Sequence, residues 1–372
     1  MKTIEELLGL KPQPANPVQP AVSFSFLFFS DVRKDISDRE KYQFTKDVTL
    51  FGDREGFTAI YLPERHFFEY GSVFANAALV ASYLIPQTER IRFRTAGISL
   101  PLHHPVEVVE AWAMNDILSN GRIDLGFGSG WQIKDFVLSP GTYENRRDVC
   151  HERIPIVQKL WRGESVNFMG PQGVDIPIRV YPRPLQPELN VWLLAVQSDA
   201  AYIYAGQQGY NIFTMLSGVD LDAMGKKFAL YRQAREQAGY DPQTGVISLM
   251  LHTFIHENKQ TVETAIKKPF MEYIKSFLDA HVASGLGSSK GVNDIGESEK
   301  AKMLEYAYHR YSKTAALFGT VEEAKQVVDH ALQVGVNDIA CLVDFGVDYA
   351  MVKSSLPHLK KLVSAYLWEK YA

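Results

Sequence analysis

Glu64, Arg65 and His66 place an acid, a permanent cation and a titratable base on one short segment of the chain. Imidazole titrates near neutral pH, so His66 is a candidate general acid or base. The guanidinium of Arg65 can hold an anion through two parallel hydrogen bonds. The same residues also suit an internal Glu–Arg ion pair with His66 bonded to backbone, and the sequence leaves both interpretations open.

A second pair of imidazoles, His103 and His104, stands directly before Pro105. Neighbouring side chains of an extended segment point to opposite sides, so we expect only one of the two to face a binding site. We take His104 as the candidate on the substrate side and expect a structural role for its neighbour.

Gly126, Gly128 and Gly130 form the clearest signal for ligand binding. Glycine lets the backbone approach a ligand closely, and the exposed N–H groups of such a loop can bind phosphate. The spacing differs from the dinucleotide fingerprint, and the sequence contains no P-loop motif. A glycine-lined corner of a barrel explains the segment equally well.

Motifs that would carry out catalysis unaided are missing. The sequence has no HExxH or CxxC metal motif and no G-x-S-x-G nucleophile elbow, and Cys150 and Cys341 form no metal-ligand spacing. We therefore expect no metal centre and infer that a bound organic cofactor supplies the difficult chemistry.

Short apolar runs alternate with longer amphipathic patterns, which predicts strands separated by helices. Pro105 and Gly121 mark the start and end of one helix, Thr320 and Glu323 form a capping box before another, and Pro155 predicts a kink or break in a third. Eight strands in this alternation predict a parallel (β/α)8 TIM barrel, because only one helix follows the last strand; the alternative is an open doubly wound sheet with a small second domain. The predicted strands are 23–29, 57–62, 91–98, 122–127, 190–196, 210–214, 246–255 and 338–343.

This pattern also predicts the domain organisation. A Pro-rich extension, 1–21, precedes a single barrel domain, 22–372, which carries insertions at about 141–189 and 256–319. Insertions at the C-terminal ends of barrel strands usually shape the active site. We expect the second insertion to form a lid whose flexible points are Gly285, Gly287 and Gly291.

The 372 residues include 39 basic and 43 acidic side chains, which gives a formal net charge of −4. This balance provides no bulk electrostatic reason to bind nucleic acid or an anionic membrane. The first residues include two early glutamates and no long apolar run, so we expect neither a secretory signal nor a membrane span and place the protein in the cytoplasm.

One long segment, residues 91–131, reads IRFRTAGISLPLHHPVEVVEAWAMNDILSNGRIDLGFGSGW and resembles the bacterial-luciferase-like flavin-dependent monooxygenases. Segments 63–67, 160–166 and 181–186 share the resemblance, which extends from about residue 22 to about residue 348. Segment 337–346 is similar to the last strand of a narrower subgroup that is often associated with nonribosomal peptide and polyketide pathways.

The resemblance implies a luciferase-like barrel that binds reduced FMN at its C-terminal mouth, with a separate flavin reductase as the supplier. It also implies a non-prolyl cis peptide between Ala96 and Gly97 under the flavin ring. By position, the residues expected to contact the cofactor are Thr95, Ala96, Gly97, Gly128, Ser129, Gly130, Gln197 and Ser198. The turn at 196–201 lacks the glycine and Thr/Glu pattern more common there, which predicts weaker or different phosphate binding.

The luciferases carry two histidines where this chain has Arg65 and His66. We therefore assign His66 as the candidate proton shuttle and Arg65 as the group that stabilises a developing oxyanion. The polar residues assigned to the substrate side are Glu64, His104 and, at the end of the last strand, Asp344.

The implied reaction transfers one oxygen atom from O2 to a small organic or carrier-tethered substrate through a C4a-peroxyflavin. Aromatic residues of the first strand are candidates for a wall that excludes water, namely Phe24, Phe26, Phe28 and Phe29. Related barrels transfer hydride with F420, and degenerate members bind flavin without catalysis, so both remain alternatives. A homodimer formed through the helices near strands two and three is also expected from the resemblance.

Overall fold

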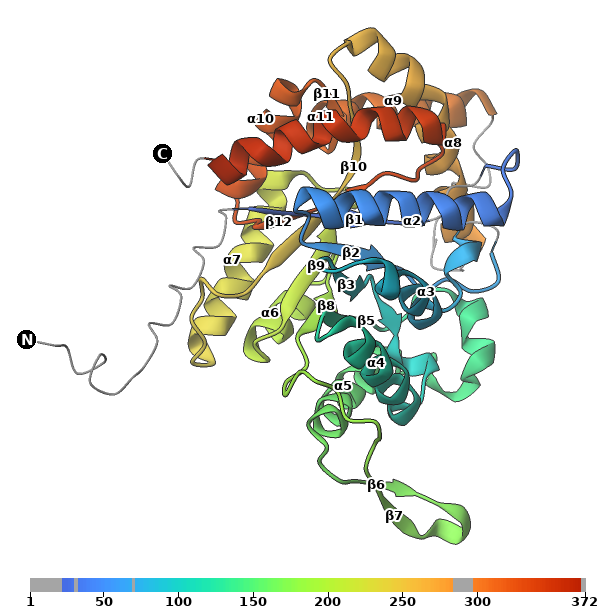
Figure 1. Ribbon diagram of the computed structural model, residues 1–372, viewed down its shortest axis with the longest axis vertical. Coiled ribbons are helices and arrows are strands. Elements are labelled where there is room, and N and C mark those ends of the chain that lie inside the picture. Colours follow the sequence, from blue (N-terminus) through green and yellow to red (C-terminus); the bar gives the residue numbers. More distant parts are fainter. Residues whose placement is uncertain (1–21, 30–32, 69–70, 284–296, 369–372) are drawn as a thin grey trace, which may run out of the picture.

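The computed structural model describes residues 22–29, 33–68, 71–283 and 297–368, and its centre is a closed barrel of eight parallel strands (Figure 1). The ring closes where the first barrel strand pairs with the last. The predicted (β/α)8 TIM barrel is thereby confirmed, and the open-sheet alternative is wrong. The barrel strands are β1 (Ser23–Leu27), β2 (Ala59–Leu62), β3 (Arg92–Thr95), β5 (Ile123–Gly128), β8 (Val191–Leu194), β9 (Asn211–Met215), β10 (Ile247–Ile255) and β12 (Asp338–Leu342).

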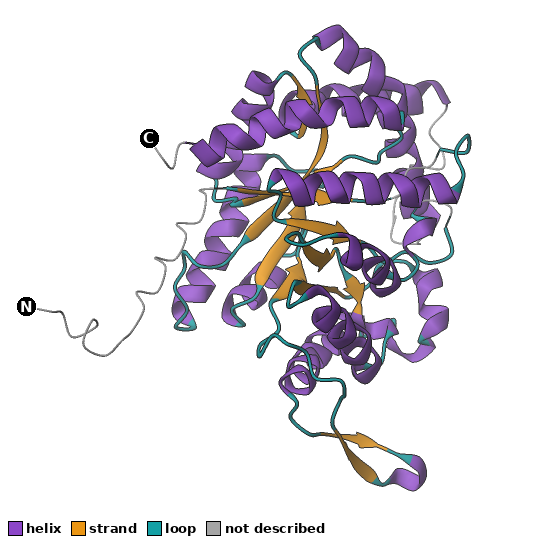
Figure 2. Ribbon diagram, viewed as in Figure 1, coloured by secondary structure: helices purple, strands orange, loops and turns teal. Residues whose placement is uncertain are grey.

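Helices surround the strands on the outside of the barrel, and each barrel strand is followed by at least one helix before the next (Figure 2). None of the helices in the described part of the chain is both long enough and apolar enough to cross a bilayer. The helices that alternate with the barrel strands are α2 (Asp38–Glu55), α3 (Ala77–Leu84), α4 (Pro105–Ser119), α5 (Arg146–Arg162), α6 (Asp199–Gln207), α7 (Leu221–Gln237), α10 (Val321–Gln333) and α11 (Tyr349–Trp368).

Local sequence explains where several of these helices begin. The first N–H groups of a helix have no partner within the helix, and capping side chains can satisfy them. Thr320 and Glu323 form the predicted capping box of α10, and Ser37 and Glu40 form another at the start of α2. Pro105 occupies the first turn of α4, as predicted.

Pro155 lies inside α5, and the helix continues through it, so the predicted break is absent. Proline removes the N–H that would bond to the carbonyl of His151, four residues earlier. The hydroxyl of Tyr204 donates a hydrogen bond to that carbonyl at 3.4 Å. A side chain of α6 therefore supplies a partner that the helix itself cannot.

Two insertions depart from the regular alternation. Between β5 and β8, a hairpin of β6 (Val166–Met169) and β7 (Asp175–Ile178) projects away from the barrel (Figure 1). Between β10 and β12, the chain forms α8 (Lys259–Ala283), α9 (Glu297–Thr314) and β11 (Ala316–Gly319) before α10. The extension predicted at 1–21 and the lid glycines Gly285, Gly287 and Gly291 lie outside the described residues.

Two details of the strands differ from the sequence prediction. The predicted third strand is divided into β3 and the short β4 (Ile98–Ser99), with Ala96 and Gly97 between them. β11 is a strand that the sequence analysis missed; it pairs with the C-terminal half of β10, where His252 lies opposite Ala316. Four residues are too few to show an alternating pattern, so periodicity alone does not reveal it.

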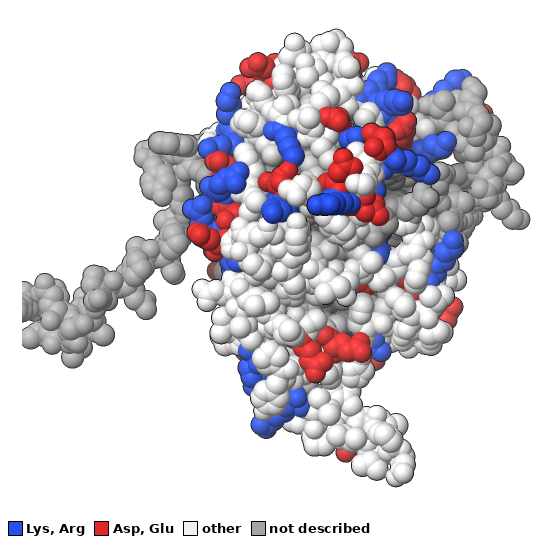
Figure 3. Space-filling view, turned by 45° about the vertical axis from the view of Figure 1, so that its right-hand side comes forward, with Lys and Arg blue, Asp and Glu red and all other residues white. Residues whose placement is uncertain are grey.

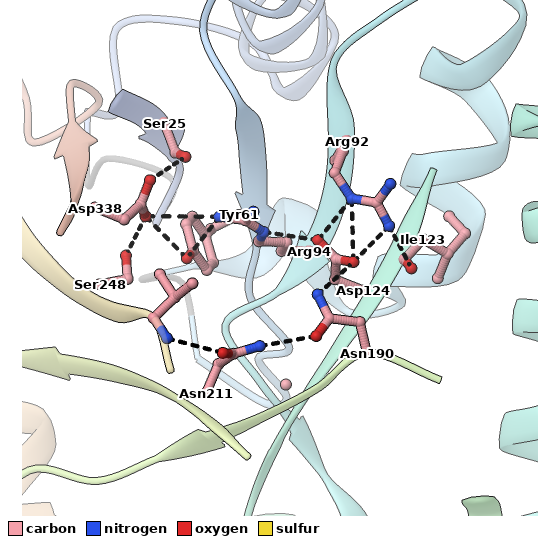
Figure 4. A network of polar contacts seen from close by, with 12 residues as sticks. Ser25, Tyr61, Arg92, Arg94, Ile123, Asp124, Asn190, Asn211, Ser248 and Asp338 are labelled. Atoms are coloured by element: carbon pink, nitrogen blue, oxygen red, sulfur yellow. Dashed lines mark hydrogen bonds and ion pairs between the residues drawn. The ribbon is translucent and has the colours of Figure 1, made fainter. Parts of the chain in front are cut away.

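A buried polar network fills the barrel near the N-terminal ends of its strands (Figure 4). Asp124 pairs with Arg94 at 2.8 Å and with Arg92 at 2.6 Å, and Arg94 lies 3.6 Å from Asp338. The carboxylate of Asp338 accepts hydrogen bonds at 2.5–3.1 Å from the hydroxyls of Ser23, Ser25, Tyr61 and Ser248. Both carboxylates are fully engaged, as expected for a region that stabilises the fold.

The four phenylalanines of the first strand do not form a common wall. Phe26 packs against Phe57 beside α2, Phe24 contacts Tyr366 of α11, and Phe28 stacks on Phe74 in η1 (Ser72–Phe74). These three rings face the surrounding helices because alternate residues of a strand point to opposite sides. Phe29 is the one of the four that contacts a predicted site residue, Arg65.

Candidate active site

Neighbouring strands bring the predicted site segments together at the C-terminal mouth of the barrel. Leu62 of β2 lies opposite Thr95 of β3, so the segments that follow these strands begin side by side. Ser99 of β4 lies opposite Gly128 at the end of β5, which places the glycine turn next to the segment after β3. The strand register therefore assembles residues that are distant in sequence.

A carboxylate and two imidazoles form the polar centre of this mouth. Oε1 of Glu64 accepts a hydrogen bond from Nε2 of His66 at 2.9 Å and another from Nε2 of His103 at 2.8 Å. The side chain of Glu64 is 6% exposed, whereas those of His66 and His103 are 14% and 30% exposed. The acid is therefore buried, and both imidazoles keep contact with solvent.

The electrostatics of this cluster favour separated charges. Burial alone would raise the pKa of Glu64, but hydrogen bonds from His103 and His66 outweigh burial and hold that pKa below its ordinary value. The hydrogen bond to Glu64 raises the pKa of His66 despite partial burial, and the negative charges of Glu64 and Asp135 act in the same direction. The pair thus favours an ionised carboxylate beside a protonated imidazole.

His104 has a different place from the one predicted. It is the exposed N-cap of α4, where its Nδ1 accepts a hydrogen bond from the N–H of Val106 at 3.3 Å. Its ring also contacts Phe168 of the projecting hairpin, with ring centres 4.9 Å apart. Only one of the two adjacent histidines turns toward Glu64, and it is His103 rather than His104.

Arg153 of α5 fixes the loop that carries His103. Its Nη1 donates hydrogen bonds to the carbonyls of Leu100, Pro101 and His103 at 3.2, 3.1 and 2.6 Å. These carbonyls lie in and directly after the short 3-10 helix η3 (Leu100–Leu102), and one guanidinium binds all three of them. Through this backbone contact, Arg153 holds the His103 ring within reach of Glu64.

Asp135 is a site residue that the sequence analysis did not identify. It lies in η4 (Ile133–Leu138), just after the glycine turn, is 8% exposed, and its Oδ1 has no hydrogen-bond partner. Burial raises the pKa of Asp135 to about 6, against the opposing effect of the positive charges of His66 and Arg65. A buried carboxyl group with an unused acceptor and a raised pKa is typical of a functional site.

Arg65 lies between aromatic rings from two sides of the mouth. Its guanidinium carbon is 5.1 Å from the ring centre of Phe29 and 5.6 Å from that of Trp131. Gly71 has a positive φ of 83°, and a Cβ there would lie 2.5 Å from Cγ of Arg65. The turn after β2 therefore needs glycine at this position to leave room for the arginine.

An apolar rim borders the polar centre. Phe67, next to His66, is 58% exposed and has a left-handed φ of 61°, which is a strained conformation for a bulky residue. The ammonium of Lys134 lies 5.2 Å from the ring centre of Phe68, which brings η4 against this segment. We define the rim by its exposed large side chains, Phe67, Ile133, Val137 and Leu138.

The peptide bond between Ala96 and Gly97 is cis, as the resemblance implies. A Cβ at Gly97 would lie 2.5 Å from a methyl carbon of Leu194 and 2.8 Å from the carbonyl oxygen of Gly126, so packing requires glycine there. The hydroxyl of Thr95 donates to that carbonyl at 2.8 Å and accepts from the N–H of Gly126 at 2.7 Å. Both hydrogen bonds of the Thr95 hydroxyl thus join β3 to β5.

The three glycines at the end of β5 and directly after it differ in what requires them. A Cβ at Gly126 would lie 2.2 Å from the carbonyl oxygen of Thr95, and Gly130 has a φ of 76°. Backbone packing explains the first glycine, and backbone conformation explains the second. A Cβ at Gly128 would meet only Leu194, at an ordinary 3.5 Å. Protein packing therefore does not require glycine at 128, and its missing side chain leaves space for a ligand.

Comparison with protein families now adds to this geometry. The sequence profile of the family described as luciferase-like monooxygenase matches residues 22–338, which include all the barrel strands up to the start of β12 and the mouth residues described above. The chain belongs to the luciferase-like monooxygenase family.

Individual relatives support the family at low sequence identity. This luciferase-like chain is 22% identical over 345 residues to the oxygenase component of flavin-dependent trigonelline monooxygenase from Acinetobacter baylyi, covering 90% of this chain and 92% of the relative. The solved oxygenating constituent of 3,6-diketocamphane monooxygenase from Pseudomonas putida, in complex with FMN, superposes with a TM-score of 0.74 at 16% identity, covering 93% of this chain and 98% of that chain. At this identity the superposition shows the shared fold alone.

A relative with a different cofactor also occurs. The chain is 30% identical over 161 residues to F420-dependent hydroxymycolic acid dehydrogenase from Mycobacterium tuberculosis, covering 42% of this chain and 43% of the relative. Membership of the luciferase-like family therefore does not by itself decide between flavin and F420.

The turn after β8 combines two predicted cofactor residues with a cation that the sequence analysis missed. Ser198 is the N-cap of α6, and its hydroxyl makes no capping hydrogen bond. Lys227 of α7 donates a hydrogen bond to the carbonyl of Gln197 at 2.7 Å and pairs with Asp199. A helix N-terminus with an uncommitted hydroxyl and a nearby ammonium can bind an anion.

Asp344, assigned by the sequence analysis to the substrate side, makes a contact within the barrel. Both of its carboxylate oxygens accept from the N–H of Phe29, at 2.8 and 3.0 Å. This contact ties the end of β12 to the end of β1 because the two strands are neighbours in the closed ring. Among the predicted substrate-side residues, Glu64 alone joins the cluster at the mouth.

Proposed function

We propose that this luciferase-like chain is the oxygenase component of a two-component monooxygenase that uses reduced FMN and O2 to oxygenate a small organic or carrier-tethered substrate. The observation that carries the proposal is Gly128. Its missing side chain leaves space that protein packing does not require, at the barrel mouth that also holds the Glu64 cluster. The relative from Acinetobacter baylyi is itself an oxygenase component, which supports a separate flavin reductase as the partner.

The residues at the mouth fit a flavin mononucleotide. Ser198 at the start of α6, Ser129 and the backbone around Gly128, with Lys227 close by, suit the phosphate. Ala96 and Gly97, between β3 and β4, carry only small side chains next to the glycine turn, which suits the close approach of a flat ring to the backbone. Asp135 offers an unused buried oxygen to a polar edge of the ligand.

Reduced FMN, when bound, would supply the electrons that activate O2. The chain's own residues then have to deliver protons and exclude water. His66, whose pKa the hydrogen bond to Glu64 raises, can donate a proton, and His103 connects the same carboxylate to solvent. Arg65 can stabilise negative charge that develops on oxygen.

The apolar rim favours a substrate with an apolar ring or chain. One of its four exposed side chains follows His66 in the chain, and the other three share η4 with Asp135, so apolar surface lies near both polar groups. An organic group placed against this rim would displace water from the mouth and bring its polar end to the cluster.

The second candidate is hydride transfer with F420, which the relative from Mycobacterium tuberculosis supports. An anaerobic titration of the purified protein with reduced FMN and with reduced F420, followed by mixing with O2, separates the two. We expect reduced FMN to bind with a Kd below about 1 mM and its oxidation to differ from that of free flavin. Binding of F420 with hydride exchange and no effect on oxygen consumption would overturn the proposal, and binding of neither cofactor would indicate a non-catalytic barrel.

We further propose a homodimer formed through α3 and α4. The two helices pack together through a hydrogen bond from Ser82 to Asn115 at 2.9 Å, and their outer faces expose large apolar side chains. These side chains are Leu79, Tyr83, Met114, Ile117 and Leu118, with exposures of 69, 45, 53, 38 and 59%. Figure 3, in which the right-hand side of Figure 1 comes forward, shows a broad central area with few charged side chains.

Substitution on this face tests the dimer. Leu118→Asp places a charge on the apolar surface and is expected to convert a dimer to a monomer in light scattering, with little change in the thermal unfolding temperature of the monomer. Val174→Asp on the projecting hairpin is the matched control, because Val174 is 57% exposed and lies far along the chain from α4. A monomeric wild-type protein, or a dimer unaffected by Leu118→Asp, would contradict this interface.

A further inference from the structure

The Glu64 cluster has a property that proton transfer does not require. Glu64, His66 and His103 each offer one atom that can ligate a metal ion, and these three atoms all lie within 4.8 Å of one another. Among the described residues, these three form one group of potential metal ligands that the fold brings together. The metal motifs sought in the sequence are local, whereas these donors come from the segments after β2 and after β3, so motif spacing could not reveal them.

The donor atoms are close to the separations that zinc needs. Zinc bonds to imidazole nitrogen and carboxylate oxygen are about 2.0–2.2 Å long in a tetrahedral site, which places neighbouring donors about 3.3 Å apart. The two observed distances to Oε1 of Glu64 are 2.9 Å for His66 and 2.8 Å for His103. An outward movement of about half an ångström, small for side chains that are partly exposed, therefore opens the tetrahedral spacing.

The chemistry of the donors selects the kind of ion. Two imidazoles and one carboxylate suit Zn²⁺ and its first-row neighbours, whereas Mg²⁺ and Ca²⁺ prefer oxygen ligands alone. Asp135 adds a second negative charge close enough to act on His66, which favours a divalent cation. The charge of Arg65 opposes binding, and its guanidinium is held against Phe29 and Trp131.

Arg153 supports one of the three potential ligands, His103. Arg153 fixes the backbone of the segment 100–103 through three hydrogen bonds, so His103 is presented by a held loop. Outer contacts of this kind orient ligands and contribute to metal affinity. The partial exposure of both imidazoles leaves a fourth position for water, as in open zinc sites.

We propose that Glu64, His66 and His103 form a binding site for Zn²⁺ in the flavin-free protein. The ion takes the place of the hydrogen bonds that His66 and His103 make to Glu64, and each imidazole binds it through a ring nitrogen that carries no proton. Since the same three groups are the proton carriers of the proposed reaction, the zinc form is inactive and a chelator restores it. Zinc therefore acts as a reversible inhibitor at the barrel mouth.

The test is a zinc titration of the metal-stripped, full-length protein without flavin, followed by calorimetry or competition with a chromophoric chelator. We expect one Zn²⁺ per chain in the wild type and in His104→Ala, the matched control that removes the adjacent histidine outside the cluster. His103→Ala and Glu64→Gln are expected to weaken binding by on the order of 100-fold. Circular dichroism of each variant shows that it is folded.

A second control addresses the other close histidine pair. The ring centres of His256, which follows β10, and His358 of α11 lie 4.9 Å apart, and neither residue belongs to the Glu64 cluster. His358→Ala is expected to leave zinc affinity unchanged. Loss of binding in His358→Ala, equal binding by His103→Ala and His104→Ala, or absence of a stoichiometric site would overturn the proposal. These outcomes are independent of flavin binding, so the zinc site and the proposed monooxygenase function can fail separately.

Discussion

Two buried aspartates at opposite ends of the barrel show how the same residue type serves different purposes. Burial alone would raise the pKa of Asp124, but the charges and hydrogen bonds of Arg94 and Arg92 outweigh burial and lower it. Asp135 at the C-terminal mouth has no such partner on Oδ1, and burial raises its pKa to about 6. A buried carboxylate with all its partners supports the fold. A buried carboxylate that lacks a partner lowers the stability of the fold, and such a loss is typical of residues with a chemical role.

The largest effect on the unfolding free energy is expected for Asp124, near the N-terminal ends of the barrel strands. Asp124→Asn leaves Arg94 and Arg92 without their buried counter-charge, and breaking a buried ion pair in this way costs about 3–5 kcal/mol of unfolding free energy. Urea unfolding measures the loss. Asp222→Asn is the control, because its side chain is 79% exposed and its pair with His330 contributes at most about 1 kcal/mol. Equal effects of the two substitutions would break the comparison.

Replacing the aspartate at the barrel mouth, Asp135, is expected to raise the unfolding free energy instead of lowering it. The folded chain holds a proton on Asp135 more tightly than the unfolded chain, because the pKa rises from 3.8 to about 6. Ionised Asp135 therefore costs stability above about pH 6, by up to about 3 kcal/mol, and nothing below about pH 4. Asp135→Asn is expected to raise the unfolding free energy at pH 8 and to leave it unchanged at pH 4.

The exposed Asp175 on β7 provides the matched substitution for Asp135. Asp175→Asn is expected to change the unfolding free energy little at either pH. A loss of stability in Asp135→Asn at pH 8 would show that the carboxylate is paired after all and would remove the contrast with Asp124.

A smaller effect on stability is expected from His252, which extends the comparison to a base. His252 is buried, and its Nε2 has no hydrogen-bond partner. Burial among aromatic rings lowers the pKa of His252 to about 3, so the unfolded chain takes up a proton below pH 6.5 that the folded chain does not. Stability is therefore lost as pH falls from 6.5 toward 3, by about 2 kcal/mol at pH 5.

His252→Phe removes this proton uptake and is expected to flatten the dependence of unfolding free energy on pH between 7 and 5. His309→Phe is the control on an exposed helix face, where the side chain is 60% exposed. The same pH dependence in wild type and His252→Phe would show that His252 is protonated in the folded chain.

The barrel could be predicted well from the sequence because apolar runs mark buried strands and the amphipathic segments between them mark helices. Six of the eight predicted strands contain the observed barrel strand, and the other two miss only the last residue of β5 and of β9. The capping box at Thr320 lies where it was predicted. β11 was not predicted because it is only four residues long and pairs only with the C-terminal half of β10. In α5, which continues through Pro155, the carbonyl of His151 accepts a hydrogen bond from Tyr204 of a separate helix, a contact that the local sequence does not reveal.

The site was predicted less completely because its partners meet only through the fold. Glu64 and His66 were identified from their types, but whether His103 or His104 joins them depends on how the loop before α4 turns. Asp135 carries no motif, and its environment consists of residues from another strand end. Thr95 and Asp344 stand at strand ends like true site residues, yet their side chains are used by neighbouring backbone.

The central claim is that the barrel mouth around Gly128 holds reduced flavin, and anaerobic equilibrium binding of reduced FMN to two glycine variants tests it most directly. Gly128→Val fills space that the protein leaves open, so the account predicts a folded protein that no longer binds reduced FMN. Gly141→Val is the control, because a Cβ there has no atom within 4 Å, and it should bind like wild type. Undiminished binding by Gly128→Val would contradict the account.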